Sequence, residues 1–292
     1  MKKLAGIFSA ALLSLALVAC GQGEEQPAEE TQTAGEQTEE TVDATEEAEV
    51  VKLVVGASNV PHAEVLEEAA PILLEEGIEI EVVRFQDYIL PNRALAGEEL
   101  DANYFQHVPY LNAQNADHDY GFVNAGGIHI EPIGIYSQNY ASLDELPEGA
   151  DIIMSSAVPD HGRILAMLEG HGLITLAEGV GISATLDDIV DNPRNLNFND
   201  RVEASLLAQA YLNGEGDAVL INSNFAIGAG LSPGTDAIAL ENPEDNPYVN
   251  VIAVRGGDET RPEIQKLVEV LQSEAIRDFI LETWEGDVVP AN

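Results

Sequence analysis

The amino-acid sequence predicts an α/β fold with two lobes, each a mostly parallel sheet flanked by helices. Two observations support this fold class. Short apolar runs, typical of buried strands, alternate along residues 50–292 with segments whose apolar residues recur at helical spacing. The runs are also too numerous for one small sheet, and no internal repeat relates them. A segment of this length can bury one or two hydrophobic cores.

The first half of this segment alternates strands with two predicted helices. Ser58 can cap the first helix, and Pro71 is expected to kink or shorten it. A short second helix is predicted from Asp87 to Leu95. Strands are predicted at residues 50–55, 78–85, 100–105 and, as one strand or two, within 122–136.

The second half repeats this alternation. Ser142 and Glu145 match a capping box, which marks the start of a helix. Further helices are predicted from Ile164 to about Gly170, and at residues 202–212, 260–272 and 275–284. Strands are predicted at residues 152–154, 218–221 and 249–254. In such folds ligands bind where loops leave the carboxyl ends of strands, and between two lobes that place becomes a cleft.

The chain starts with the features of a secretory signal. Two lysines precede an apolar run from Leu4 to Val18, which is shorter than the roughly 20 apolar residues of a membrane-spanning helix. The run leads into Leu17-Val18-Ala19-Cys20-Gly21, which resembles the lipobox of bacterial lipoproteins. This resemblance implies removal of residues 1–19 and lipidation of Cys20; a plain signal peptide with an incidental cysteine is the alternative.

Cysteine usage and charge exclude several function classes. Cys20 is the only cysteine, so the domain has no thiol for catalysis, for a disulfide or for a cysteine-based metal site. Residues 20–49 are acidic and without lysine or arginine, and we expect them to form a disordered linker. The chain has 52 acidic residues against 12 basic ones, which argues against nucleic acid and anionic lipid as partners.

An ordered series of short motifs resembles one family, the methionine-binding lipoproteins of the NlpA type. The phrase LDANYFQH at residues 100–107 is the most specific of them, and together the motifs cover essentially all of residues 50–292. The other motifs are GASNVPHAEVL at 56–66, DYILPN at 87–92, Tyr136-Ser137, SLDEL at 142–146, Gly162-Arg163, NPRNL at 192–196, Ile221-Asn222 and PYVN at 247–250.

The resemblance implies a two-lobed periplasmic-binding-protein fold, with the ligand between the lobes. One lobe would comprise residues 50–135 and 225–292, and the other residues 136–224. It also implies a monomer that is held to the outer face of the cell membrane through Cys20. This monomer would deliver a small amino acid, methionine or a similar compound, to an ABC permease and its ATPase. No cofactor and no enzymatic activity are implied.

The charged groups of an amino acid need opposite charges in the site. The planar fork of an arginine can donate to both oxygens of a carboxylate, and Arg163 lies just before the apolar helical run. Free backbone N–H groups at the start of that helix would add to the site. In the family, the asparagine matched by Asn222 touches the backbone atoms of the ligand. The alternatives are an exposed surface arginine and an asparagine that caps its own turn.

An apolar or thioether side chain favours an aromatic surround. Tyr88, Phe105 and Tyr110 match the aromatic wall of the family, although one of them can instead be ordinary core packing. His107 follows Phe105 by two residues and would share its face of a continuing strand, where it could hydrogen-bond the ligand. A purely structural histidine is the alternative.

One departure from the family pattern bears on the ligand. The family has an asparagine three residues before the arginine, whereas this chain has Asp160. A carboxylate there would pair with the ligand ammonium or with Arg163, and either pairing would change selectivity. A divalent-metal receptor and a purely structural lipoprotein remain as other functions. The six histidines are scattered without the spacing of a metal motif, and we predict no metal site.

Overall fold

The computed structural model describes residues 50–291 and contains two sheets that account for most of the strands. The predicted signal peptide, Cys20 and the acidic linker lie outside the described residues. The first sheet has the strand order β13-β4-β12-β3-β1-β2. Its strands are β1 (Val51–Ser58), β2 (Ile78–Phe85), β3 (Ala102–His107), β4 (Phe122–Ile130), β12 (Val249–Arg255) and β13 (Val289–Pro290). Strand β1 pairs in parallel with β2 and β3, whereas β12 is antiparallel to β3 and β4.

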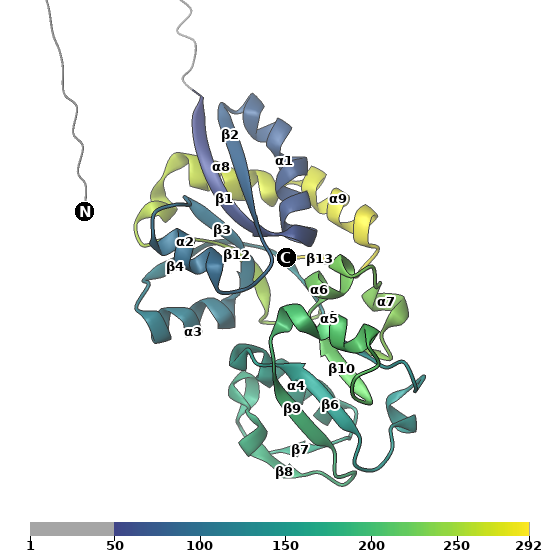
Figure 1. The fold of residues 1–292 in the computed structure, drawn as a ribbon. Helices are drawn as coiled ribbons and strands as arrows, with labels where there is room; N and C mark the ends of the chain where they lie inside the picture. The colour runs from purple at the N-terminus through teal and green to yellow at the C-terminus, as the bar shows by residue number, and fades with distance from the viewer. Residues whose placement is uncertain (1–49, 292) are drawn as a thin grey trace, which may run out of the picture. The chain divides into compact units, whose positions relative to one another are not determined.

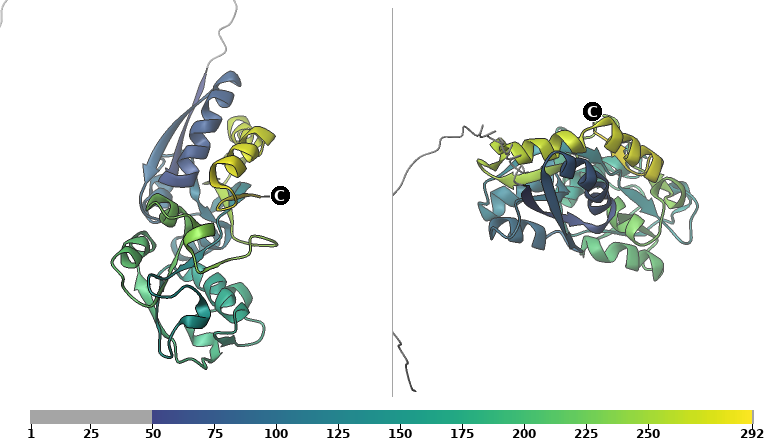
Figure 2. Two further views of the ribbon diagram at one scale, coloured as in Figure 1. Left: turned by 90° about the vertical axis from the view of Figure 1, so that its right-hand side faces the viewer. Right: turned by 90° about the horizontal axis from the view of Figure 1, so that it is seen from above.

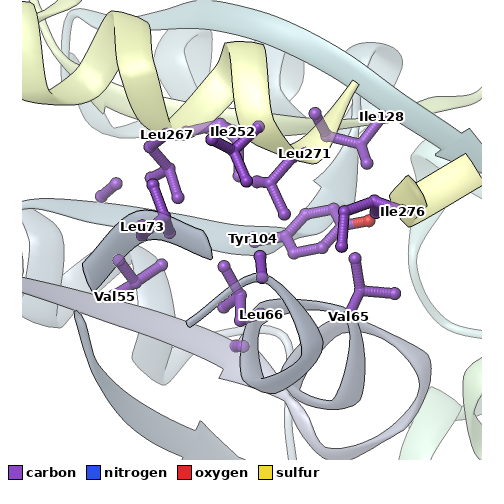
Figure 3. Packing of buried hydrophobic residues seen from close by; sticks show 14 of the residues in the cluster. Val55, Val65, Leu66, Leu73, Tyr104, Ile128, Ile252, Leu267, Leu271 and Ile276 are labelled. Atoms are coloured by element: carbon purple, nitrogen blue, oxygen red, sulfur yellow. The ribbon is translucent and has the colours of Figure 1, made fainter. Parts of the chain in front are cut away.

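Helices cover both faces of the first sheet (Figures 1 and 2). On one face lie α1 (Glu64–Glu75), α8 (Pro262–Leu271) and α9 (Glu274–Trp284), and on the other α2 (Leu90–Ala96) and α3 (Val108–His118). Alternate residues of a strand point to opposite faces, so Val55 packs with α1 while Val54 packs with α2 and α3. Figure 3 shows Leu66 of α1 and Leu271 of α8 gathered near the ring of Tyr104.

The second sheet has the order β11-β5-β10-β6-β9 and is also mixed. Its strands are β5 (Gly134–Tyr136), β6 (Asp151–Ser155), β9 (Asn197–Val202), β10 (Ala218–Ile221) and β11 (Ala239–Leu240). Helix α4 (Val158–Gly170) packs on one face, and α5 (Ala204–Leu212) with α6 (Ser223–Gly228) on the other. Smaller elements complete the chain, namely α7 (Pro233–Asp236) and the hairpin of β7 (Thr175–Leu176) and β8 (Ile189–Asp191).

The chain passes between the sheets in two short segments. Residues 131–133 lead from β4 to β5, and residues 241–248 lead from β11 back to β12. We call them the first and second crossing segments. Strand β11 lies within residues 225–292, yet it pairs with β5 in the second sheet. The lobe boundaries expected from the sequence stay a prediction.

The α/β fold class is confirmed, and both sheets are mixed rather than mostly parallel. Several local expectations are wrong. Ser58 makes no capping bond and a π-helical turn (Asn59–Ala63) precedes α1, which then continues through Pro71. The capping box at Ser142 gives only a 3₁₀ turn (Leu143–Glu145), in which the Glu145 carboxylate accepts from the backbone of Ala141. Helix α4 begins at Val158, so Arg163 lies in its second turn and not before it.

No helix within residues 50–291 has the length and apolar character needed to cross a membrane. The remaining short 3₁₀ turns are Gly181–Ser183, Leu186–Asp188 and Asp258–Thr260. The positions of His107, Glu131, Asn222, Asp160 and Arg163, discussed below, follow from the ends of β3, β4 and β10 and from the first turns of α4.

Candidate functional site

A small cavity lies where elements of the two sheets meet. The first sheet and its helices contribute β3, α3 and β12, and the second contributes α4 and the turn after β10. Its lining residues are Tyr88, Phe105, Gln106, His107, Tyr110, Glu131, Asp160, Arg163, Asn222, Ser223 and Asn250.

All seven residues predicted for the site line this one cavity. They form two groups, which we call the aromatic wall (Tyr88, Phe105 and Tyr110) and the charged wall (Asp160, Arg163 and Asn222). His107 lies between them. The structure therefore brings together residues that are far apart in the sequence, while their contact with a ligand remains a prediction.

His107 ends β3 and connects the two walls. Its Nδ1 accepts a hydrogen bond from the backbone N–H of Tyr110 at 3.1 Å, which caps α3. The hydrogen of a neutral ring therefore lies on Nε2, which donates to Asp160 Oδ1 at 2.9 Å. The side chain that ends a strand of the first sheet thus holds a carboxylate of α4.

Asp160 lies in the first turn of α4 and is buried. Asn222 Nδ2 donates to its Oδ2 at 3.0 Å, and Arg163 Nη1 lies 3.9 Å from its Oδ1. Burial by itself raises the pKa of Asp160, but the hydrogen bond and charge of His107 and the charge of Arg163 lower it overall. The carboxylate is therefore ionised and already has several partners.

Arg163 contacts both crossing segments. Its Nε donates to the Glu241 carboxylate at 3.1 and 3.2 Å, and its Nη2 donates to the backbone oxygen of Glu131 at 2.6 Å. The guanidinium carbon also lies 4.7 Å from the centre of the Tyr248 ring. Although burial lowers the pKa of Arg163, Glu241 and Asp160 raise it overall, so the group stays charged. The remaining guanidinium nitrogen, Nη1, lies nearest to Asp160 of the charged wall.

The rings of the aromatic wall contact one another. The centroids of Tyr88, Phe105 and Tyr110 lie 6.0 Å apart in each pair. The Tyr110 hydroxyl donates to the backbone oxygen of Tyr88 at 2.9 Å, and the Tyr88 hydroxyl donates to Asn224 Oδ1 at 2.6 Å. These bonds satisfy the hydroxyl groups and leave ring faces and edges to line the cavity.

A third group, the histidine–glutamate cluster (His62, His129 and Glu131), is buried, and its Glu131 lines the cavity. Glu131 Oε1 accepts from His129 Nε2 at 2.8 Å and lies 3.2 Å from His62 Nε2. Glu131 Oε2 accepts from the backbone N–H of Asn224 at 3.0 Å. Burial lowers the pKa of His62 to about 4 and that of His129 to about 3. Burial also raises the pKa of Glu131.

The donor atoms of this cluster lie within 4.8 Å of one another, a spacing that a metal ion can use. The sequence spacing predicted no metal site, because His62 and His129 come from different elements. However, the Nε2 atom of each ring faces oxygen acceptors, and His62 Nε2 also lies 3.0 Å from Asn250 Oδ1. His129 Nδ1 is hydrogen-bonded to the Tyr104 hydroxyl. The Nε2 atoms of both rings and the Glu131 oxygens therefore already have partners, whereas His62 Nδ1 is buried without one.

Sequence reasoning missed several residues of the site. Glu131 and Glu241 are two among many acidic residues, and no local pattern sets them apart. Tyr248 and Asn250 lie in the PYVN motif, which carried the family resemblance without a stated role. One sequence signal could have indicated Glu131. It is a polar residue directly after a buried strand, β4.

Comparison with known proteins places the chain among bacterial lipoproteins. The family model described as NlpA lipoprotein matches residues 53–292. A relative in Bacillus subtilis, the methionine-binding lipoprotein MetQ, is 51% identical over 243 residues, which are 82% of this chain and 88% of the relative. The D-methionine-binding lipoprotein MetQ of Escherichia coli is 34% identical over 94% of this chain and 93% of its own length.

Solved structures show the same fold. A pheromone precursor and lipoprotein from Enterococcus faecalis has a TM-score of 0.80 at 52% identity, covering 82% of this chain and all of that chain. A nutrient-binding protein from Burkholderia cenocepacia, solved bound to methionine, has a TM-score of 0.78 at 38% identity with the same coverage.

Proposed function

The chain belongs to the NlpA lipoprotein family, and from this premise we propose that it captures a small amino acid for an ABC importer. The proposed ligand is methionine, in the L or D form, or a similar compound or short methionine peptide. Relatives with methionine in their names and a relative solved with methionine support this choice.

The single observation that carries the proposal is the arrangement of the cavity. A buried, charged arginine with carboxylate and amide neighbours lies on one side, and three contacting aromatic rings lie on the other. A zwitterion with an apolar side chain has the complementary distribution of charge and surface. Burial of a methionine-sized side chain contributes about 1.5–3 kcal/mol, and sulfur–ring contact adds about 0.3–1.5 kcal/mol.

The ligand carboxylate would bind Arg163 through Nη1, because Glu241 and the Glu131 backbone occupy the other guanidinium nitrogens. The ammonium would lie toward Asp160 and Asn222, and the side chain against Phe105 and its neighbours. Asp160, in place of the asparagine of the family, adds negative charge to this end of the cavity.

The proposed cycle is capture by closure. A ligand that touches both walls favours the form in which they approach, to the extent of its preference for that form. The closed monomer, tethered outside the membrane by lipid on Cys20, would dock on a permease whose ATPase supplies the energy. The lobes of this cycle would be residues 50–135 with 225–292, and residues 136–224. The cycle includes no covalent step and no cofactor.

A thermal-shift panel of amino acids, methionine dipeptides and divalent metals tests the proposal on the full chain in detergent. Saturation at 100 times Kd stabilises a protein by about 2.7 kcal/mol, so we expect methionine to raise Tm by roughly 5–10 °C. No shift with any amino acid would contradict the proposed function. A shift with a metal alone, lost on chelation, would support a metal receptor instead.

Arg163→Ala should weaken methionine binding in calorimetry by at least about 100-fold, because a buried carboxylate then lacks its cation. Arg163→Lys keeps the charge but loses the planar fork, so its affinity for methionine should lie between that of Arg163→Ala and that of the wild type. The exposed Arg93, changed to Ala, is the matched control. Unchanged affinity in a folded Arg163→Ala protein would remove this residue from the site.

A further inference from the structure

The charges that line the cavity do not balance. The lining includes the carboxylates of Glu131 and Asp160 and a single guanidinium, that of Arg163. Arg163 is already paired with the carboxylate of Glu241. His107 accepts a backbone N–H on Nδ1, so this nitrogen carries no proton. A zwitterion adds no net charge, so the cavity with methionine bound keeps an excess of negative charge.

Carboxylates also lie on the outer side of the aromatic wall. Tyr88 and Tyr110 line a second groove, whose other lining residues include Asp87, Asp117 and Glu203. Among the described residues that line this groove, none is a lysine or an arginine. The two tyrosine rings therefore border two hollows, each with more carboxylates than cations.

These carboxylates act on the rings of the aromatic wall. Burial raises the pKa of Tyr88, and the charges of Asp160 and Glu131 raise it further, whereas the opposing effect of Arg163 is smaller. Burial is also the largest cause of the raised pKa of Tyr110, and the charge of Asp160 adds to it. The electrostatic potential at the aromatic wall is therefore negative, which favours a cation there.

The rings offer the surface that a weakly hydrated cation needs. Tyr88, Phe105 and Tyr110 lie with their centroids 6.0 Å apart in each pair, and Phe225 adds a ring 5.0 Å from Tyr88. The faces of several aromatic rings attract a methylated onium group within about 6 Å of their centroids. Such a group has no N–H or O–H donor, so its burial on a wall of ring carbons leaves no hydrogen bond unmade.

We propose that the site also binds amino acids whose side chain ends in a methylated onium group, such as the dimethylsulfonium of S-methylmethionine. This inference rests on the proposed function for the amino-acid part of the ligand and names a further substrate class of the same site. The sulfonium would lie against Phe105, where the thioether of methionine is proposed to lie. Its charge would offset the excess of carboxylates, and its methyl groups would keep the apolar contact.

The first test compares two ligands of the same shape. S-methylmethionine and 2-amino-5-methylhexanoate both end in two methyl groups on one atom, which is a positive sulfur in the first and a neutral carbon in the second. The ratio of their affinities, measured by calorimetry on the full chain in detergent, therefore isolates the charge. We expect S-methylmethionine to bind at least about 10-fold more tightly.

Two outcomes of this comparison contradict the inference in different ways. If methionine binds and S-methylmethionine binds no more tightly than the neutral compound, the inference is overturned and the proposed function stands. If methionine and both of these compounds fail to bind, the inference and the proposed function are overturned together.

The second test locates the source of the preference. Asp160→Asn removes one carboxylate with little change of shape, and should reduce the affinity ratio at least about 3-fold. Phe105→Leu keeps an apolar surface but removes a ring, and should reduce the ratio by roughly the same factor. Glu282→Gln, at an exposed site on α9, is the matched control and should keep the wild-type ratio. An unchanged ratio in both Asp160→Asn and Phe105→Leu would overturn the inference, because neither carboxylates nor rings would then recognise the charge.

Discussion

The aromatic wall and the polar side of the cavity are built in different ways. Tyr88, Phe105 and Tyr110 lie within one short stretch of the chain, and their rings contact one another. The polar side consists of the charged wall and the histidine–glutamate cluster, and its bonds join distant segments, such as Arg163 to both crossing segments. Phe105 and Tyr110 are therefore positioned by packing within one stretch of the chain, although Tyr88 also contacts Asn224 and Phe225 of α6. The polar groups depend on how the two sheets meet. Recognition of charge, more than of the side chain, should thus be coupled to closure.

The largest expected effect is a loss of stability in acid that arises on the polar side alone. His62 and His129 have folded-state pKa values of about 4 and about 3, below the ordinary value of 6.5. In this pH range the unfolded chain binds protons that the folded chain does not bind. The free energy of unfolding therefore falls as pH drops from about 6.5 toward 4. His62 alone accounts for about 3 kcal/mol over this window. The pKa of Glu131 is raised by burial, so this group alone would make stability rise as pH falls. It opposes the effect of the two histidines and does not cancel it.

Urea unfolding at pH 7, 6, 5 and 4 measures this slope. His62→Asn should flatten it, and the exposed His171→Asn should leave it unchanged. A free energy of unfolding that stays constant from pH 6.5 to 4 would show that the buried rings are not held neutral.

The next effect concerns the ion pair between Arg163 and the second crossing segment. The side chains of Arg163 and Glu241 are only 3% and 11% exposed. Glu241→Ala leaves a buried guanidinium without its main partner and should lower the free energy of unfolding by about 3–5 kcal/mol. Glu241→Gln should cost less, because its amide oxygen still accepts.

Denaturant unfolding with Glu244→Ala as the control checks this prediction, since Glu244 is exposed in the same segment. A cost of less than about 1 kcal/mol for Glu241→Ala would mean that Asp160 or solvent already compensates Arg163. The polar side would then be less dependent on the crossing segments than the structure indicates.

The difference between the two regions also explains what the sequence could predict. The strand and helix alternation is local, so β2, β10, α8 and α9 were predicted from apolar runs, periodicity and capping signals, whereas α3, α6 and β9 were not predicted. The seven predicted site residues came from motifs matched to a family. Glu131 and Glu241 lie in short crossing segments without periodicity, among 52 acidic residues. Their importance arises from contacts with Arg163, His62 and His129, which only the folded chain brings near. The antiparallel placement of β12 between β3 and β4 likewise depends on topology rather than on residue spacing.

The smallest expected effect is confined to the aromatic wall. Norleucine has a methylene where methionine has sulfur, so the ratio of their affinities isolates the contact between sulfur and ring. Phe105→Leu keeps an apolar surface and removes a ring, and should reduce the preference for methionine by roughly 2- to 10-fold, which corresponds to about 0.3–1.5 kcal/mol. Phe122→Leu is the control, because Phe122 is buried in the same half of the fold but does not line the cavity. If Phe105→Leu leaves the ratio unchanged while weakening both ligands, the wall contributes apolar area only. If the ratio shifts in Phe122→Leu as well, the rings act through packing of the whole first sheet, and the wall is not the locally preformed surface inferred from its contacts.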